Sequence, residues 1–457
     1  MKAIPASSLV LITACFALPA AATPARPEEV SPSVCGYASI QEAIDANPGR
    51  MMYVPAGEYP VEHALHITAD DTGLYGPGTI VQNNLQENIL EIERTTGVRI
   101  EGLTLTRPAT RQETLRHGLV VRDSEDIDLE GLRILDNRST AASLLLENCR
   151  HAAVRRCSVA NYKRIGMDDR TTSELYGYAF RVIDGTGIAV TRSRGVLIQD
   201  NRIIETIIYP TEETKEKHRL GELMEGERPM KKGRLAPEGD YANNWHQGSA
   251  IVVTDPLETA HVLISGNYIE NAAQGIDIHA DHVTCTHNVI AYAFIGIKCM
   301  HGSRNVIISN NNVSHNDLWG LVMMPGTASH PAEAARNGAP ARPANYTSGN
   351  IIAGNIFSDF GFGYEHHNWK DAKSGVISLE SGQLPENPVM TDVLIEGNIV
   401  YDSGKDEVLV EGVPTRVPPR YEYAVYITPD PRPQGLRFSH NIFHPGRGGI
   451  SNVPFEP

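Results

Sequence analysis

One hydrophobic pattern recurs along most of this chain, and each copy contains an asparagine. Val262-Leu-Ile-Ser-Gly-Asn-Tyr-Ile269 is an example, with aliphatic residues at alternate places before the asparagine and another one after it. The asparagines of the seven copies are Asn201, Asn267, Asn288, Asn311, Asn355, Asn398 and Asn441. Asn267 and Asn288 are 21 residues apart, and Asn288 and Asn311 are 23 residues apart. Self-similarity at such a period predicts the stacked coils of a solenoid.

A second short strand is expected between these units, hydrophobic at its first and third places. The copies begin at Leu119, Leu144, Phe180, Ile251, Ile276, Ile297 and Leu321. Alternation with a period of two points one set of side chains inward and the other outward. Coils of about 22 residues with two or three such strands predict an all-β fold, a parallel β-helix. Its core is aliphatic, and the repeated asparagines form an amide ladder at one turn.

The outward second place of these strands is mostly aliphatic, but three strands carry a charge there. In chain order the place reads Val120, Leu145, Arg181, Val252, Asp277, Lys298 and Val322. Paired strands lie about 4.8 Å apart, so Asp277 and Lys298 are expected to be neighbours on adjacent coils. His279 takes the fourth place of its strand, and His301 follows the next strand. We therefore predict one charged patch, formed by Arg181, Asp277, His279, Lys298 and His301.

Two long insertions are predicted to interrupt the coils, at about 206–247 and 325–348. The first is rich in Lys and Arg, and the second is rich in Pro and Ala. Long connections in a compact solenoid are usually lids or binding loops. We expect both insertions to wall a groove over the charged patch. The residues expected to contact a substrate there are Tyr241, Trp245, His246 and Arg122.

The charge balance limits the partners, and the first residues indicate an export signal. With 457 residues and a formal net charge of -15, the chain is acidic, which argues against nucleic acid or an anionic membrane as a partner. Lys2, the apolar run 9–18 and the small residues Ala20 and Ala22 predict a signal peptide over 1–22. Residues 23–457 would form a single β-helix domain. We expect a secreted or periplasmic monomer.

The cysteines do not predict a disulfide framework. Without Cys15, which lies in the signal peptide, an odd number is left, and no spacing is of the CxxC type. We expect buried thiols rather than a zinc site at Cys35, Cys149, Cys157, Cys285 and Cys299.

The start of the expected domain resembles a known family. Ile40-Gln-Glu-Ala-Ile-Asp-Ala46 followed by Tyr53-Val-Pro-Ala-Gly-Glu-Tyr59 looks like the opening of pectin-lyase-like right-handed β-helix proteins. Together with the coils, the resemblance covers nearly the whole mature chain. It implies a right-handed solenoid with a short amphipathic capping helix at its N-terminal end. It does not specify a substrate, because one fold supports many activities.

Two motifs narrow the resemblance to enzymes that act on uronates. Gly275-Ile-Asp-Ile-His279 is similar to the Asp-Pro-His motif of mannuronan C5-epimerases, with Ile278 in place of the proline and Ala280 in place of the usual acidic residue. Gly296-Ile-Lys-Cys-Met-His-Gly302 looks like the lysine-bearing strand of β-helix alginate and glucuronan lyases. This second likeness implies that Lys298 acts as the base or as the partner of the substrate carboxylate.

Both activities begin by removing the C5 proton of a uronate. This step needs a cation at the carboxylate and a base near C5. Arg181 suits the first role, because guanidinium offers a planar fork. His279 or Lys298 would be the base, with Asp277 orienting one of them, and the reference pKa of histidine, about 6.5, suits that role. The expected proton donors are Tyr241, His246 and His301.

We therefore predict a polysaccharide lyase that cleaves an acidic polysaccharide such as alginate or glucuronan by β-elimination. The alternatives are a C5-epimerase, a glycoside hydrolase and a non-catalytic glycan-binding β-helix. A hydrolase needs two opposed carboxylates, and Asp277 has no evident acidic partner. The pair Asp277–Lys298 is alternatively a plain surface ion pair, and His279 a surface histidine without a function.

Metal binding is a further alternative. His279, His282 and His301 are candidate ligands, although their spacing is not diagnostic. Pectate lyases of this fold commonly use Ca²⁺, for which Asp277, Asp281 and Asp255 would supply oxygen ligands. The cations in the patch favour a site without a metal, so we predict no cofactor.

Overall fold

The computed structural model describes residues 32–165, 183–206, 248–316, 318–336, 338–359, 375–382, 384–402, 407–416, 419 and 421–454. They belong to one compact unit, Pro32–Pro457. The predicted signal peptide and nearly all of the insertion at 206–247 lie outside the described residues. None of the helices in the described part is long and apolar enough to cross a membrane.

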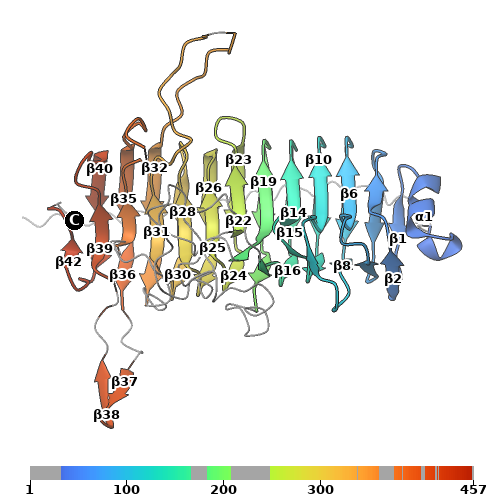
Figure 1. The fold of residues 1–457 in the computed structure, drawn as a ribbon, viewed down its shortest axis with the longest axis horizontal. Helices are drawn as coiled ribbons and strands as arrows, with labels where there is room; N and C mark the ends of the chain where they lie inside the picture. Colours follow the sequence, from blue (N-terminus) through green and yellow to red (C-terminus); the bar gives the residue numbers. More distant parts are fainter. Residues whose placement is uncertain are drawn as a thin grey trace, which may run out of the picture. The chain divides into compact units, whose positions relative to one another are not determined.

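The described residues form a right-handed parallel β-helix, as predicted, with three parallel sheets of 12 strands each (Figure 1). Every complete coil crosses sheet A, sheet B and sheet C in this order. Sheet A contains β1 (Met51–Tyr53), β4 (Gly73–Tyr75), β7 (Arg99–Glu101), β11 (Asp128–Glu130), β15 (Ala153–Arg155), β20 (Leu197–Gln199), β23 (Ala260–Ser265), β26 (Asp281–Thr286), β29 (Ile307–Ser309), β32 (Ser348–Ala353), β35 (Thr391–Glu396) and β40 (Gln434–Ser439).

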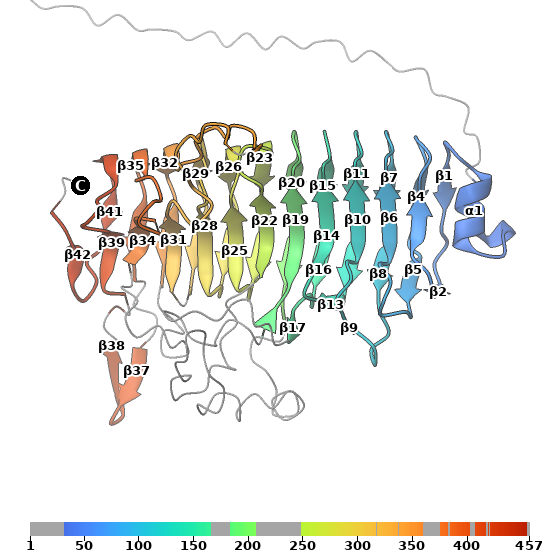
Figure 2. The ribbon, with the colours of Figure 1, turned by 45° about the horizontal axis from the view of Figure 1, so that its top comes forward.

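Sheet B contains β2 (Glu58–Val61), β5 (Thr79–Gln82), β8 (Thr104–Thr106), β12 (Arg133–Leu135), β16 (Ser158–Ala160), β21 (Arg202–Ile204), β24 (Tyr268–Glu270), β27 (Val289–Ala291), β30 (Asn312–Ser314), β33 (Ile356–Ser358), β36 (Ile399–Tyr401) and β41 (Ile442–Phe443). Sheet C contains β3 (Leu65–Ile67), β6 (Leu90–Glu93), β10 (Leu119–Arg122), β14 (Ala142–Glu147), β19 (Thr186–Thr191), β22 (Ser249–Thr254), β25 (Gln274–Ile278), β28 (Ile295–Cys299), β31 (Trp319–Met323), β34 (Gly375–Leu379), β39 (Tyr423–Ile427) and β42 (Gly449–Ser451). Sheets A and C lie side by side along the solenoid (Figure 2).

The remaining elements are short. They are η1 (Val34–Gly36), α1 (Ile40–Ala46), the pair β9 (Glu113–Thr114) and β13 (Arg138–Ser139), the pair β17 (Arg164–Ile165) and β18 (Ile183–Asp184), and the pair β37 (Glu407–Val410) and β38 (Val413–Arg416). Helix α1 covers the N-terminal end of the coils, where the resemblance implies a capping helix (Figure 2). It begins with a capping box, because Ser39 accepts from the backbone N–H of Glu42 and Glu42 accepts from that of Ala38.

The inward side chains stack from coil to coil, as the alternation predicts. Ile251, Ile276, Ile297 and Leu321 follow one another in register across sheet C, and all four are fully buried. Burying each such side chain stabilises the fold by about 1.5–3 kcal/mol relative to leaving it exposed. The core is a continuous aliphatic column that does not depend on the insertions.

The predicted asparagine ladder is confirmed at the turn between sheets A and B. Each side-chain amide donates to the side-chain oxygen of the next asparagine at 2.9–3.1 Å, from Asn201 to Asn441. Asn288 also donates to the carbonyl oxygen of Ile264, and its side-chain oxygen accepts from the backbone N–H of Asn267. The ladder therefore satisfies backbone groups that the turn would leave buried and unpaired.

Replacing Asn288 by alanine is expected to lower the free energy of unfolding by about 2–4 kcal/mol, because buried groups of Asn267 and Ile264 lose their partners. Urea denaturation followed by circular dichroism measures this change. Asn312→Ala is the matched control, since Asn312 is exposed one coil later, and it should change the value by less than about 0.5 kcal/mol. Equal midpoints for the two variants would contradict the role of the ladder.

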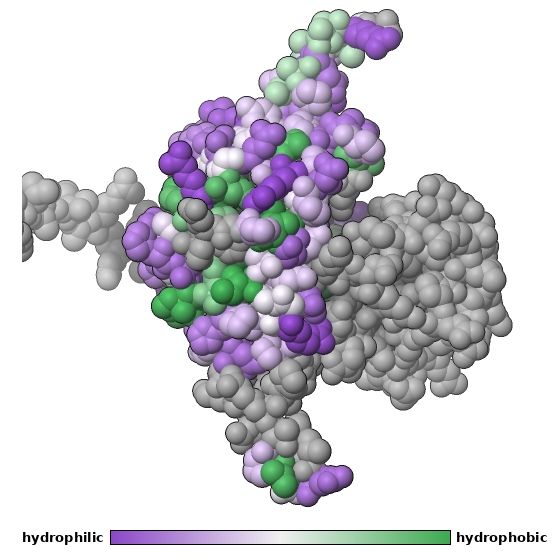
Figure 3. All heavy atoms as spheres, turned by 90° about the vertical axis from the view of Figure 1, so that its left-hand side faces the viewer, coloured by the Kyte–Doolittle hydropathy of each residue, from purple (hydrophilic) through white to green (hydrophobic). Residues whose placement is uncertain are grey.

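The C-terminal end of the coils has no helix among the described residues. Figure 3 faces this end and shows hydrophobic side chains among hydrophilic ones. Ile442 and Ile450 are 55% and 40% exposed there. The described thiols at Cys149, Cys157, Cys285 and Cys299 are buried as expected, whereas Cys35 is exposed, so the prediction is wrong for that residue.

The insertion at 325–348 lies mostly within the described residues, and it does not form the predicted wall of a groove. Antiparallel bridges join Glu333 to Arg342 and Arg336 to Ala339, which makes the segment a narrow arm. The arm projects away from the coils (Figure 1), and its residues from Pro331 to Pro343 are exposed where described. Only its base packs against the solenoid, through the buried residues Ser329 and Asn345. The proline- and alanine-rich part of the arm therefore does not cover the charged patch.

Candidate functional site

The charged patch lies on the outer face of sheet C, where β25 and β28 pair in parallel. Asp277 and Lys298 are register partners, which confirms that they are neighbours on adjacent coils. The residues that flank Asp277 in β25, Ile276 and Ile278, are fully buried in the core. The period of two therefore fixes Asp277 outward.

Asp277 contacts two basic side chains at once. Its Oδ2 atom lies 2.9 Å from the Lys298 Nζ atom, and its Oδ1 atom lies 2.6 Å from the His279 Nε2 atom. The second contact is a close approach of the two atoms that does not meet the geometry of a hydrogen bond. The side chains of Asp277, His279 and Lys298 are only 6%, 12% and 15% exposed. We call these three residues the ion triad.

The ion triad holds a buried negative charge. Burial alone would raise the pKa of Asp277, but the nearby His279 imidazole and Lys298 ammonium outweigh burial and hold that pKa well below its usual range. Asp277 is therefore a carboxylate at every ordinary working pH. His279 also approaches Thr254, whose Oγ1 atom lies 3.3 Å from the His279 Nδ1 atom. Thr254 is a contact that the sequence analysis did not assign to the site.

His301 borders the ion triad and joins it to the base of the arm. Its ring meets the ring of His279 edge-on, with the ring centroids 4.5 Å apart. The His301 Nδ1 atom accepts from the backbone N–H of Ala328 at 3.2 Å, and Asn345 donates to the His301 carbonyl oxygen at 2.9 Å. Burial, helped by the positive charges of His279 and Lys298, lowers the pKa of His301 to about 3. His301 is therefore neutral at working pH, with its proton assigned to Nε2.

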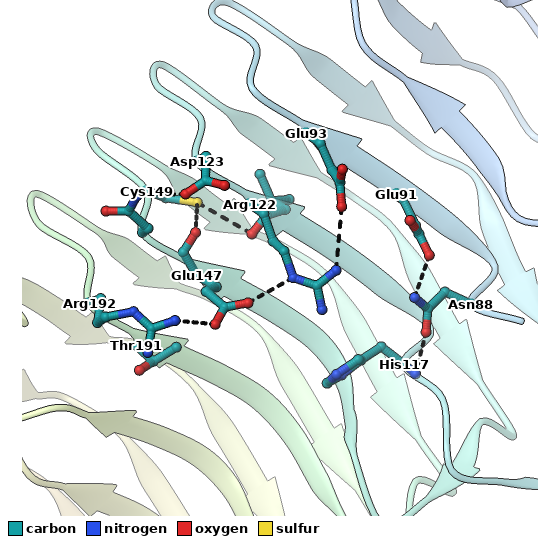
Figure 4. Close-up of polar contacts among 12 residues, drawn as sticks. Asn88, Glu91, Glu93, His117, Arg122, Asp123, Glu147, Cys149, Thr191 and Arg192 are labelled. Atoms are coloured by element: carbon teal, nitrogen blue, oxygen red, sulfur yellow. Dashed lines mark hydrogen bonds and ion pairs between the residues drawn. The ribbon is translucent and has the colours of Figure 1, made fainter.

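The structure does not place Arg122 at the patch. Its guanidinium is held in a charge ladder on the same sheet, with Nε 2.7 Å from Glu147 and Nη1 3.4 Å from Glu93 (Figure 4). Burial works against the charge, but these two carboxylates raise the pKa of Arg122. Four strand steps separate Arg122 from His279, roughly 19 Å at about 4.8 Å per step.

Four predicted site residues, Arg181, Tyr241, Trp245 and His246, lie outside the described residues. The rung assigned to Arg181 is nevertheless described, and that assignment is wrong. Between Leu145 and Val252 the outward place of sheet C holds Ala189, in β19. Of the predicted patch, the structure brings together Asp277, His279, Lys298 and His301.

Two of the three carboxylates suggested for Ca²⁺, those of Asp281 and Asp255, are each paired with an arginine. Asp281 lies 2.5 Å from Arg304, and Asp255 contacts Arg192 at 3.4 Å and accepts from Thr191 at 2.8 Å. Neither carboxylate contacts the ion triad, so these residues do not fit a Ca²⁺ site centred on Asp277.

A second polar group on sheet C was missed by the sequence analysis. Ser378 follows Val322 in the outward column that contains Lys298, and Glu380 is two residues further along the chain. The signal was present, because Ile377-Ser-Leu379 repeats the alternation of the other strands.

Comparisons with known proteins bear on the fold. No protein-family model and no curated protein matches the sequence. The Dettilon tailspike protein is 13% identical with a TM-score of 0.52, over 90% of this chain and 64% of that one, so this chain spans less than two thirds of it. DFA-IIIase from Arthrobacter chlorophenolicus is 12% identical with a TM-score of 0.52, over 92% and 96% of the two chains. The A-module of a mannuronan C-5 epimerase from Azotobacter vinelandii is 14% identical with a TM-score of 0.47, over 93% and 100%. The likeness to the tailspike protein and to DFA-IIIase shows a shared fold and no more.

Proposed function

We propose that this protein is a polysaccharide lyase that cleaves an acidic, uronate-containing polysaccharide by β-elimination. The observation that supports the proposal is the ion triad. Asp277 is nearly fully buried and contacts His279 and Lys298 on the outer face of sheet C, between the aliphatic Val252 and Val322 of the flanking coils. An ordinary surface ion pair contributes little and is solvated, whereas this arrangement keeps two basic groups at fixed positions in a desolvated site.

His279 is the proposed base that removes the C5 proton. Its side chain is oriented by Asp277 on one ring nitrogen and by Thr254 near the other. Histidine is the side chain that most often serves as a general base in enzymes. Lys298 is the proposed partner of the substrate carboxylate, because its Nζ atom is held at a fixed position, 2.9 Å from the Asp277 Oδ2 atom. An ammonium ion stabilises the enolate-like charge that builds up when C5 is deprotonated.

His301 is proposed as a positioning residue rather than the proton donor. With a pKa of about 3 it has no imidazolium proton to give at working pH. Its ring orients His279 by the edge-on contact, and it anchors Ala328 at the base of the arm. The proposed donors to the leaving O4 atom are then Tyr241 and His246, which lie outside the described residues.

A C5-epimerase is the second candidate, because Asp277 and His279 occur in a motif similar to that of mannuronan C5-epimerases and the first step is shared. The hydrolase alternative is weaker. The carboxyl of Glu380 belongs to the third strand after that of Asp277, roughly 14 Å away at about 4.8 Å per strand. Hydrolases with two carboxylates hold them about 5–9.5 Å apart.

We also propose that residues 1–22 export the chain, that the mature protein acts outside the cytoplasm as a monomer, and that the reaction needs no cofactor. Arg228, Lys231, Lys232 and Arg234 of the insertion at 206–247 would supply local positive charge to an acidic substrate, although the chain as a whole carries a net charge of -15.

Ultraviolet absorbance during incubation with alginate, glucuronan and polygalacturonate tests the reaction. A lyase leaves a conjugated double bond on the new non-reducing end, so absorbance is expected to rise on at least one of these polymers. A flat trace on every polymer, with exchange of the C5 proton into deuterated water, would replace the lyase by an epimerase. No absorbance change and no exchange would leave a glycan-binding protein.

A further inference from the structure

Glu380 and Ser378 lie on the same outer face as the ion triad, towards the C-terminal end of the solenoid. Lys298, Val322 and Ser378 are successive register partners in β28, β31 and β34. The backbone N–H of Glu380 donates to the carbonyl oxygen of Met323 at 2.8 Å, which extends the same parallel pairing by one residue. Glu380 therefore stands in the outward column that contains His279, three strand steps further along the solenoid.

The column between His279 and Glu380 is apolar. Met300 and Met324 are its members there, and both are buried, as is Val322 in the neighbouring column. Two polar groups are thus separated by one apolar stretch on one face. A sugar polymer has this alternation of polar substituents and apolar ring faces, so the face suits a chain that runs along the solenoid axis.

The Glu380 carboxyl differs from the other carboxylates of sheet C that have been described. Glu147 contacts Arg122 and Arg192, and Asp277 contacts Lys298. Among the described residues no cation pairs with Glu380. Its Oε1 atom accepts from the Ser378 hydroxyl at 2.6 Å, and no described residue bonds to its Oε2 atom.

A carboxyl without a cation in a desolvated place prefers its neutral form. Burial raises the pKa of Glu380, and the hydrogen bond from Ser378 opposes this only in part. Because Oε1 accepts from Ser378, the acid proton belongs on Oε2, where it is available as a donor. The chemistry that such a donor recognises best is an anionic oxygen, since charge-assisted hydrogen bonds are the strong ones.

We propose that Glu380, held by Ser378, forms a distal subsite that binds the carboxylate of a second uronate unit of the same polysaccharide chain. This inference rests on the proposed function, because it takes the ion triad as the place where the first uronate binds. The subsite lies two strand steps from Lys298, roughly 10 Å at about 4.8 Å per step. A disaccharide is too short to place its two carboxylates at both positions. Glu380 thereby selects for long chains and for uronates against neutral sugars.

The donor role has a pH signature. A protonated Glu380 donates to a uronate, and an ionised Glu380 repels it, so affinity is expected to fall as the pH rises through the raised pKa of Glu380. The titratable described groups that act on this region are Tyr426 and Tyr423. Burial, Glu380 and Tyr423 raise the pKa of Tyr426, so this phenol stays neutral over the same pH range.

Calorimetric titration of the full chain carrying His279→Ala tests the subsite without turnover. The ligands are a uronate octasaccharide and a disaccharide of the polymer that the wild-type protein binds, from pH 5 to pH 9. Adding Glu380→Ala is expected to weaken octasaccharide binding at pH 5 about tenfold, the value of one charge-assisted hydrogen bond. Disaccharide binding should not show this loss. Glu380→Gln, which keeps a neutral donor, should retain most of the affinity and lose the pH dependence.

Glu396→Gln is the matched control, because Glu396 is a half-exposed carboxylate on sheet A. It is expected to bind as the parent does. Equal octasaccharide affinities of the parent and the Glu380→Ala variant at pH 5 would overturn the subsite. Failure of the proposed reaction looks different, because the wild-type protein would then yield no unsaturated product while the length- and pH-dependent binding persisted. Folding of each variant is checked by circular dichroism.

Discussion

Replacing His279 by alanine is expected to lower kcat by about 10²–10⁴-fold, the usual contribution of a positioned general base. Within the ion triad, His279 is the residue proposed to accept the C5 proton. The folded state should survive, because the side chain is still 12% exposed and lies outside the aliphatic core. Initial rates of ultraviolet absorbance at saturating polymer measure kcat, and circular dichroism reports the fold.

His66→Ala is the matched control for this variant. His66 belongs to β3 of the same sheet and pairs with Glu91, but its side chain is 51% exposed and several coils away. Its removal should leave kcat within a factor of two. If His279→Ala kept more than half of the wild-type rate, Lys298 would have to be the base, and the pH–rate profile would then lose its histidine limb.

Much of the fold follows from the sequence, because a solenoid repeats its local physics. Each asparagine of the ladder hydrogen-bonds the backbone of the same buried turn, so one asparagine is needed in each coil. Its recurrence from Asn201 to Asn441 reveals the period of the solenoid. The pair Asp277–Lys298 was predictable for the same reason. Once the inward residues Ile276 and Ile297 are aligned, the alternation fixes which residues follow them outward.

The errors arose where a coil contains an insertion. Phe180-Arg-Val-Ile183 and Ile188-Ala-Val-Thr191 both show the alternation, and nothing local says which of them pairs with β14. Sheet C uses the second, so Ala189 fills the rung that was assigned to Arg181.

The partners of an outward side chain cannot be predicted from its place in a strand alone. Arg122 looked available for substrate from its place in a strand, but its two carboxylate partners come from strands 25 and 29 residues away.

The ion triad also predicts the largest change in stability. Asp277→Ala removes the carboxylate between the Lys298 ammonium and the His279 imidazole, and leaves the ammonium buried without a counter-charge. Removing one partner of a buried pair costs about 3–5 kcal/mol. We expect a loss of this size in the free energy of unfolding at pH 7, measured by urea denaturation, together with loss of turnover. A loss below about 1 kcal/mol would mean that the pair is solvated.

The double variant Asp277→Ala/Lys298→Met separates the cost of an orphan charge from that of lost packing, since replacing both partners of a buried pair by apolar residues is often nearly neutral. The double variant should recover at least half of the free energy of unfolding that Asp277→Ala loses.

The pH dependence of the free energy of unfolding is an independent test of the Asp277–Lys298 pair. Because the folded pKa of Asp277 is depressed, its contribution is complete above the unfolded value of about 3.9 and fades as the pH falls through the folded pKa. The difference between wild type and Asp277→Ala should therefore stay constant from pH 8 to pH 5 and shrink only in stronger acid. A difference that instead shrank between pH 5 and pH 7 would show that the stability comes from protonation of His279 and not from the Asp277–Lys298 pair.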